Sequence, residues 1–279
     1  MRIEKTDQEI QEQISEALDL IASVLQDNVL GVYLYGSATL GGLQKYSDID
    51  LFVVTDHSLT NEQRGQLVSR LLNISAAYPP TGKRRSIELT IDKKSELNPW
   101  KYPPSFDFQY GDWMREEFQS GDFKSSLETV NPDIAIIATQ VMLSGENLVG
   151  LPLDKLMDEV PYGDFMRATS GGVTDLLPEL KDDTRNVLLT LARIWHTLAT
   201  DTISSKDAVA KWTFNKLPEK SVEVMGHAYE VLLGEETENW NKFTQEQIRE
   251  CAYQLVKEVD LAKGRVKYDD KTKHISISM

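Results

Sequence analysis

Two aspartates interrupt a stretch that otherwise has the composition of a buried β-strand. Asp48 and Asp50 bracket Ile49 at the start of the run "SDIDLFVV". Because the side chains of a strand alternate between its two faces, both carboxylates are expected side by side on one face. Neighbouring anions repel unless a cation lies between them, and Mg²⁺ prefers carboxylate ligands, with its remaining positions filled by water and phosphate. The pair therefore predicts a site for a divalent metal ion.

A third carboxylate follows the same logic in the run "RSIELTID". Its apolar residues Ile87, Leu89 and Ile91 occupy one face of a strand, which leaves Glu88 and Thr90 on the other. If this strand is adjacent to the previous one in a sheet, Glu88 joins the two aspartates. A carboxylate in that position is suited to hold metal or to take a proton from an attacking hydroxyl.

The β-rich run "VLGVYLYG" ends at Gly36, and Ser37 follows it, eleven residues before the first aspartate. Gly36 and Ser37 are expected where a strand turns into a helix, which presents free backbone N–H groups to an anion such as a triphosphate. Together with the three carboxylates they predict a site for nucleotidyl transfer, in which metal ions neutralise the phosphate oxygens and the pyrophosphate leaving group. The plainer interpretation is that the carboxylates are polar residues at a strand start and on an exposed strand face.

The elements that must position these residues fall into two parts. An amphipathic helix over 8–24, the strands above, a helix over about 60–74 and a surface segment rich in proline over 98–106 predict a mixed α/β sheet. Beyond about residue 130 the pattern becomes helical, with no further strand evident before the tail, and helices are expected over 131–145, 182–200, 205–212, 218–232 and 244–261. We place the boundary near residue 157, so that a mixed-sheet domain (1–157) precedes an all-α helical bundle (158–279). The last residues are expected to form a small hairpin or a frayed end.

Composition limits the partners. The chain has 279 residues, a formal net charge of -14 and one cysteine, Cys251. No apolar run approaches the roughly 18 residues of a membrane span, and the start lacks the pattern of a signal peptide. We therefore expect a cytoplasmic protein that binds neither membranes nor nucleic acid, since phosphate binding needs clustered basic residues, and whose charge attracts a cationic small molecule. The alternative is that the acidic surface serves solubility alone. We also expect it to be a monomer.

The motif in residues 35–54, "YGSATLGGLQKYSDIDLFVV", resembles the signature of the nucleotidyltransferase superfamily. From about residue 28 to 240 the chain is similar to the bacterial aminoglycoside adenylyltransferases that act on streptomycin and spectinomycin, on the stretches "SIELTI", "PWKYPPSFDFQYGDWMREEFQSG", "DDTRNVLLTLARIWHT" and "SSKDAVAKW". The resemblance implies a nucleotidyltransferase domain followed by a helical domain, with ATP and drug bound in the cleft between them.

The resemblance also assigns roles to residues. It implies that nucleotide phosphates and two magnesium ions are held by Gly36, Ser37, Ser47, Asp48 and Asp50, with Glu88 as a further metal ligand and the general base. It implies basic contacts to the triphosphate from Arg193 and Lys206, and an acid near the nucleotide at Asp133. It implies a drug pocket lined by Trp113, Asp183 and Asn186.

Each role has a plainer alternative. Arg193 is equally suited to a surface ion pair, Lys206 to a helix start, Trp113 to a core anchor and Asp183 to a helix N-cap, while Glu116 and Glu117 are interpreted as a solvated acidic face.

The expected reaction is the transfer of AMP from ATP to a hydroxyl of streptomycin, spectinomycin or both, which gives antibiotic resistance. The presence of both Trp113 and Asp183 favours both drugs, because a large cation needs more anchoring. The alternatives are transfer to spectinomycin alone, transfer to another small molecule or a protein, and a nucleotide-binding relative without turnover.

Overall fold

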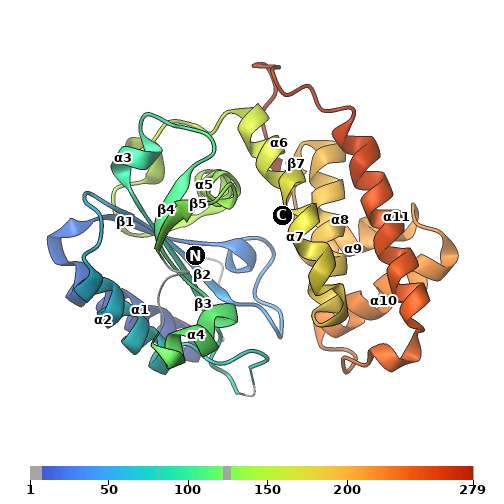
Figure 1. The fold of residues 1–279 in the computed structure, drawn as a ribbon, viewed down its shortest axis with the longest axis horizontal. Helices are drawn as coiled ribbons and strands as arrows, with labels where there is room; N and C mark the ends of the chain where they lie inside the picture. The colour runs from blue at the N-terminus through green and yellow to red at the C-terminus, as the bar shows by residue number, and fades with distance from the viewer. Residues whose placement is uncertain (1–7, 81, 122–126, 279) are drawn as a thin grey trace. The chain divides into compact units, whose positions relative to one another are not determined.

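The computed structural model describes residues 8–80, 82–121 and 127–278. The chain divides into two compact units, the first ending at Val160 and the second beginning at Pro161 (Figure 1). The first unit holds a mixed sheet with helices and the second is mainly helical, as the sequence predicts.

The sheet of the first unit has six strands in the order β5-β4-β3-β2-β1-β6. Only β2 and β3 run parallel, and the other neighbouring pairs are antiparallel. The strands are β1 (Val29–Tyr35), β2 (Ile49–Thr55), β3 (Ile87–Lys93), β4 (Ser105–Tyr110), β5 (Leu127–Val130) and β6 (Glu146–Gly150).

One face of the sheet is covered by α1 (Gln8–Leu25) and α2 (Asn61–Ile74), which lie together on the same side in Figure 1. The alternate residues of β2 and β3 point into this layer, where they form one buried cluster with both helices: Ile49, Leu51, Val53, Ile87, Leu89 and Ile91. Burying a leucine or isoleucine contributes roughly 1.5–3 kcal/mol. Because this burial fixes which face of each strand is apolar, it also fixes the opposite face as the one that carries Asp50 and Glu88.

The remaining helices of the first unit are short except α5. They are α3 (Lys94–Leu97), α4 (Arg115–Ser120) and α5 (Asp133–Ser144), with the proline-rich segment between α3 and β4 outside regular structure. Just before α5, the Asn131 side chain accepts a hydrogen bond from the backbone N–H of Asp133 at 2.9 Å. This contact fixes Asp133 as the first residue of its helix.

In the second unit α8 (Thr184–Thr200) packs against α6 (Tyr162–Gly171), α9 (Lys206–Phe214), α10 (Glu219–Leu233) and α11 (Gln245–Lys263). The short α7 (Val173–Leu176) precedes it. Four of the predicted helices, α8 to α11, are confirmed within a few residues at their ends. Among the described residues, no helix combines the length and apolar composition that a membrane crossing requires.

Two parts of the pattern outside the acidic strands were wrong. A strand, β6, follows α5 where none was expected, and it pairs with β1 at the edge of the sheet. In the tail, β8 (Ser276–Ile277) is neither a hairpin nor a frayed end, because it pairs in parallel with β7 (Thr202–Ile203). The second unit is therefore not purely helical, since this two-stranded pair joins its tail to the end of α8.

Candidate active site

Three neighbouring strands place polar side chains in one row. Tyr35 of β1 pairs with Asp50 of β2, and Asp50 pairs with Glu88 of β3. Directly paired residues project from the same face of a sheet, with β-carbons about 5 Å apart. The structure thus brings Asp50 and Glu88 together as predicted, and adds Tyr35, which sequence reasoning missed.

Asp48 lies one residue before β2 begins, so the alternation that predicted its place beside Asp50 does not apply to it. Its loop is held by Arg85, whose guanidinium donates hydrogen bonds to the backbone carbonyls of Gln44 (2.5 Å), Lys45 (2.6 Å) and Ser47 (3.4 Å). The Ser47 hydroxyl oxygen also accepts from the backbone N–H of Gln44 at 2.9 Å. Hydrogen bonds from Arg85, two residues before β3, therefore fix the loop that carries Ser47 and Asp48.

Gly36 is required at the end of β1 for two separate reasons. Its φ is +67°, in the left-handed region that favours glycine. In addition, a β-carbon at this position would lie 1.9 Å from Oδ2 of Asp50, so the carboxylate occupies the space that any side chain would need. Gly36 and Ser37 open only one 3₁₀ turn, Gly36–Ala38, which corrects the expectation of a helix after this strand.

The row is strongly acidic around a neutral phenol. Burial raises the pKa of the Tyr35 hydroxyl well above its usual value, and the charges of Asp50, Glu88 and Asp133 raise it further. Asp133, at the start of α5, is therefore close enough to the row to act on its electrostatics. A set of carboxylate oxygens gathered on one face suits a hard divalent cation such as Mg²⁺.

An exposed indole forms the second feature of the first unit. Trp113 is 62% exposed, and its ring lies across Gly111, where a β-carbon would come within 2.2 Å of two ring carbons. The ring is therefore not a core anchor. It lines a groove of about 350 Å³ with Phe106, Gln109, Met114, Glu117, Thr129, Val130 and Asn131. Glu117 lines this groove and does not lie on a purely solvated face. Residues four apart on a helix are neighbours, so the spacing from Trp113 could have predicted this position.

Polar residues of the second unit gather at the starts of α8 and α9. Lys206 donates a hydrogen bond to Oδ1 of Asn186 at 2.8 Å. Asp183 occupies the N-cap position of α8, and its side chain bonds with Asn186. Burial raises the pKa of the Asp183 carboxyl, and Glu238 adds to this, while Asn186 and Lys206 oppose it. Arg193 lies seven residues after Asn186 on α8, which places both on the same side of the helix.

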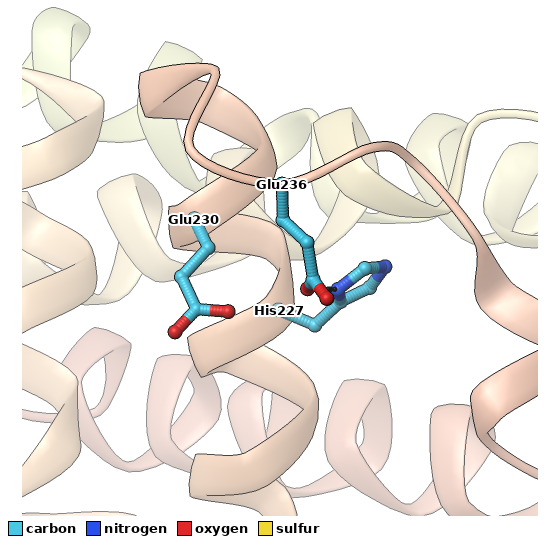
Figure 2. Close-up of side chains that lie close together, drawn as sticks. All are labelled: His227, Glu230 and Glu236. Atoms are coloured by element: carbon cyan, nitrogen blue, oxygen red, sulfur yellow. Dashed lines mark hydrogen bonds and ion pairs between the residues drawn. The ribbon is translucent and has the colours of Figure 1, made fainter.

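A histidine and two glutamates meet at the end of α10, where Figure 2 shows His227 beside Glu236 and near Glu230. Both ring nitrogens of His227 have protein partners. The backbone N–H of Asn239 donates to Nε2 at 3.3 Å, so the proton is on Nδ1, which donates to Glu236 at 2.6 Å. Lys242 and His227 hold the pKa of the Glu236 carboxyl below its usual value. These contacts account for the cluster as an anchor of the loop after α10.

The comparisons with known proteins agree with this geometry. Residues 19–93 match the family model described as polymerase beta nucleotidyltransferase, and residues 155–258 match the C-terminal domain of aminoglycoside adenylyltransferases. The fold and the acidic row thus define a nucleotidyltransferase.

Its relatives identify the family. A spectinomycin 9-adenylyltransferase from Campylobacter jejuni is 35% identical over 85% of this chain and 91% of its own. An aminoglycoside (3'')(9) adenylyltransferase from Escherichia coli is 34% identical over 92% of this chain and 95% of its own. The crystal structure of the spectinomycin adenyltransferase AAD(9) from Enterococcus faecialis, with ATP and spectinomycin, matches with a TM-score of 0.84 at 29% identity, over 90% of this chain and 99% of that one. The chain belongs to the aminoglycoside adenylyltransferase family and is an ATP-dependent nucleotidyltransferase.

Proposed function

We propose that this enzyme transfers AMP from ATP to a hydroxyl group of spectinomycin and of streptomycin. The observation that carries the proposal is the register that sets Asp50 opposite Glu88, with Asp50 seated against Gly36. The names of the relatives support the choice of substrates. One is named a spectinomycin 9-adenylyltransferase and another an aminoglycoside (3'')(9) adenylyltransferase.

In the proposed reaction Glu88 accepts the proton of the attacking hydroxyl. The hydroxyl oxygen forms a bond to the α-phosphorus of ATP while the bond from that phosphorus to the pyrophosphate oxygen breaks. Asp48, Asp50 and Glu88 would hold divalent metal, and when bound this metal neutralises charge on the phosphate oxygens and the leaving group.

The remaining assignments concern the nucleotide. Gly36, Ser37 and Ser47 are proposed to contact its phosphates from the first unit, with Asp133 near the nucleotide. Arg193 and Lys206 are proposed to contact the triphosphate from the second unit, where they belong to the same polar region as Asn186. Two magnesium ions are proposed, which would neutralise charge on the phosphates and on the leaving group.

Trp113 is proposed to stack against the drug, because its exposed ring offers a face to a cationic group. The neighbouring carboxylate of Glu117 adds negative charge to the same groove. Asp183 and Asn186 are proposed to contact the drug from the second unit. Two anchoring sites suit streptomycin, which carries guanidinium groups, as well as the more compact spectinomycin.

The nearest competing function is transfer to spectinomycin alone, which the names of several relatives favour. The test is to incubate the purified enzyme with ATP, Mg²⁺ and each antibiotic separately, and to look for the AMP adduct by mass spectrometry. We expect an adduct of both drugs. An adduct of spectinomycin alone would establish the narrower function, and no adduct of either drug would overturn the proposal.

A further inference from the structure

A buried tyrosine completes the acidic row from its β1 side. Tyr35 is 6% exposed and pairs directly with Asp50, so its ring projects from the same sheet face as Asp50 and Glu88. It has no place in the proposed chemistry. A tyrosine hydroxyl is neutral near pH 7, so it is able to donate one hydrogen bond.

A chain of polar side chains across the sheet sets the direction of that bond. Gln109 of β4 donates to the hydroxyl oxygen of Thr90 on β3 at 3.4 Å. The Thr90 hydroxyl acts on the Tyr35 hydroxyl as a hydrogen-bond donor does, because it lowers the pKa of Tyr35 against the larger effect of burial. Because the Thr90 oxygen already accepts from Gln109, its own proton is available to the Tyr35 oxygen. The phenolic proton is then available to the carboxylates of the row, which the strand register places on the same face, with Asp50 directly opposite Tyr35.

We propose that Tyr35 is a positioning residue for adenylyl transfer, which donates a hydrogen bond to the Asp50 and Glu88 row and is itself oriented by Thr90. This inference rests on the proposed function of that row. A hydrogen bond from a buried neutral donor to a carboxylate is strong and directional, so it holds the carboxylate in one rotamer. Thr90 acts on the row only by orienting the Tyr35 hydroxyl, and for this it needs only its own hydroxyl group.

Tyr35→Phe removes the hydroxyl and keeps the ring. We expect kcat to fall about tenfold or more, while KM for ATP and for the drug changes less than about threefold, because alignment is lost and binding surface is kept. We also expect the Mn²⁺ affinity of the resting protein, measured by electron paramagnetic resonance without substrates, to fall severalfold.

Tyr33→Phe is the matched control. Tyr33 lies on the same strand and the same face, is 1% exposed, and donates to the backbone carbonyl of Leu151 at 2.6 Å, away from the row. Its removal is expected to lower the melting temperature and to leave Mn²⁺ affinity and kcat unchanged.

Two variants of Thr90 separate positioning from packing. Thr90→Ser keeps the hydroxyl and should behave like the wild type, whereas Thr90→Val should reproduce the losses of Tyr35→Phe. The double variant Tyr35→Phe/Thr90→Val should be no worse than Tyr35→Phe alone, because both act through one bond.

The proposal is overturned if folded Tyr35→Phe keeps kcat and Mn²⁺ affinity within twofold of the wild type, or if Thr90→Ser is as impaired as Thr90→Val. If the wild type adenylylates neither drug, the proposed function fails. The Mn²⁺ affinity of wild type and Tyr35→Phe still decides whether Tyr35 orients the carboxylates. If Tyr35→Phe does not fold, the two Thr90 variants decide it.

Discussion

At the scale of single residues, the site depends on a close contact between a glycine and a carboxylate. Asp50 reaches over the backbone of Gly36, in the space where a β-carbon would be. The contact ties the end of β1 to the start of β2 and fixes where the carboxylate points. Any larger residue at position 36 must move Asp50 out of its row.

Gly36→Ala is therefore expected to abolish measurable binding of Mn²⁺–ATP in calorimetry and to destabilise the fold by about 1–3 kcal/mol, because it combines backbone strain with displacement of Asp50. Gly42→Ala is the matched control, since Gly42 also has a positive φ, +99°, but nothing lies within 4 Å of its missing β-carbon. The Gly42→Ala variant should lose unfolding free energy because of backbone strain, but it should still bind Mn²⁺–ATP. Equal loss of binding in both variants would contradict the proposed contact.

At the scale of elements, the sequence predicts best those that bury a periodic apolar face. The helices α1 and α8 and the strands β2 and β3 have such faces, and the alternation in β3 sufficed to predict Glu88 beside Asp50 once the two strands paired in parallel. The strand β6 was missed because "ENLVG" is short and its partner is distant in sequence. Tyr35 was missed for a related reason, since its neighbours are set by the order of strands and not by any local pattern.

The end of β3 holds a buried carboxyl that serves no proposed chemistry. Asp92 is fully buried, and its Oδ2 has no hydrogen-bond partner among the described residues. Burial is the main cause that raises its pKa to about 8. In the unfolded chain its pKa is near 3.9. Between these values the folded protein holds a proton that the unfolded chain has lost, so this group makes stability fall as pH rises from about 4 to about 8.

Asp92→Asn keeps the shape and removes the ionisation. We expect the wild type to lose up to about 1.4 kcal/mol of unfolding free energy per pH unit between pH 5 and pH 8 relative to this variant. Denaturant titrations at several pH values measure the difference, with Asp19→Asn on the exposed side of α1 as the control. Parallel pH profiles for wild type and Asp92→Asn would show that Asp92 is not protonated in the folded state.

At the scale of the whole molecule, the net charge of -14 favours a cationic substrate. Screening by salt weakens this attraction, since the Debye length falls from about 10 Å at 0.1 M to about 3 Å at 1 M. The dissociation constant of streptomycin, measured by calorimetry, is expected to rise severalfold from about 0.05 M to about 0.5 M NaCl, and that of spectinomycin to rise less. If salt changes the affinity for neither drug, the acidic surface does not attract the substrate and serves solubility alone.

The account as a whole requires Glu88, held opposite Asp50, to take the proton of the attacking hydroxyl. The most direct test compares Glu88→Gln with the wild type in two measurements, the rate of AMP transfer to spectinomycin and the affinity for Mn²⁺–ATP. The account predicts a loss on the order of 10²–10⁴ in kcat, with nucleotide affinity within a few-fold of the wild type, because the amide keeps the shape and an oxygen ligand but accepts no proton. A Glu88→Gln enzyme that transfers AMP at near the wild-type rate would contradict it.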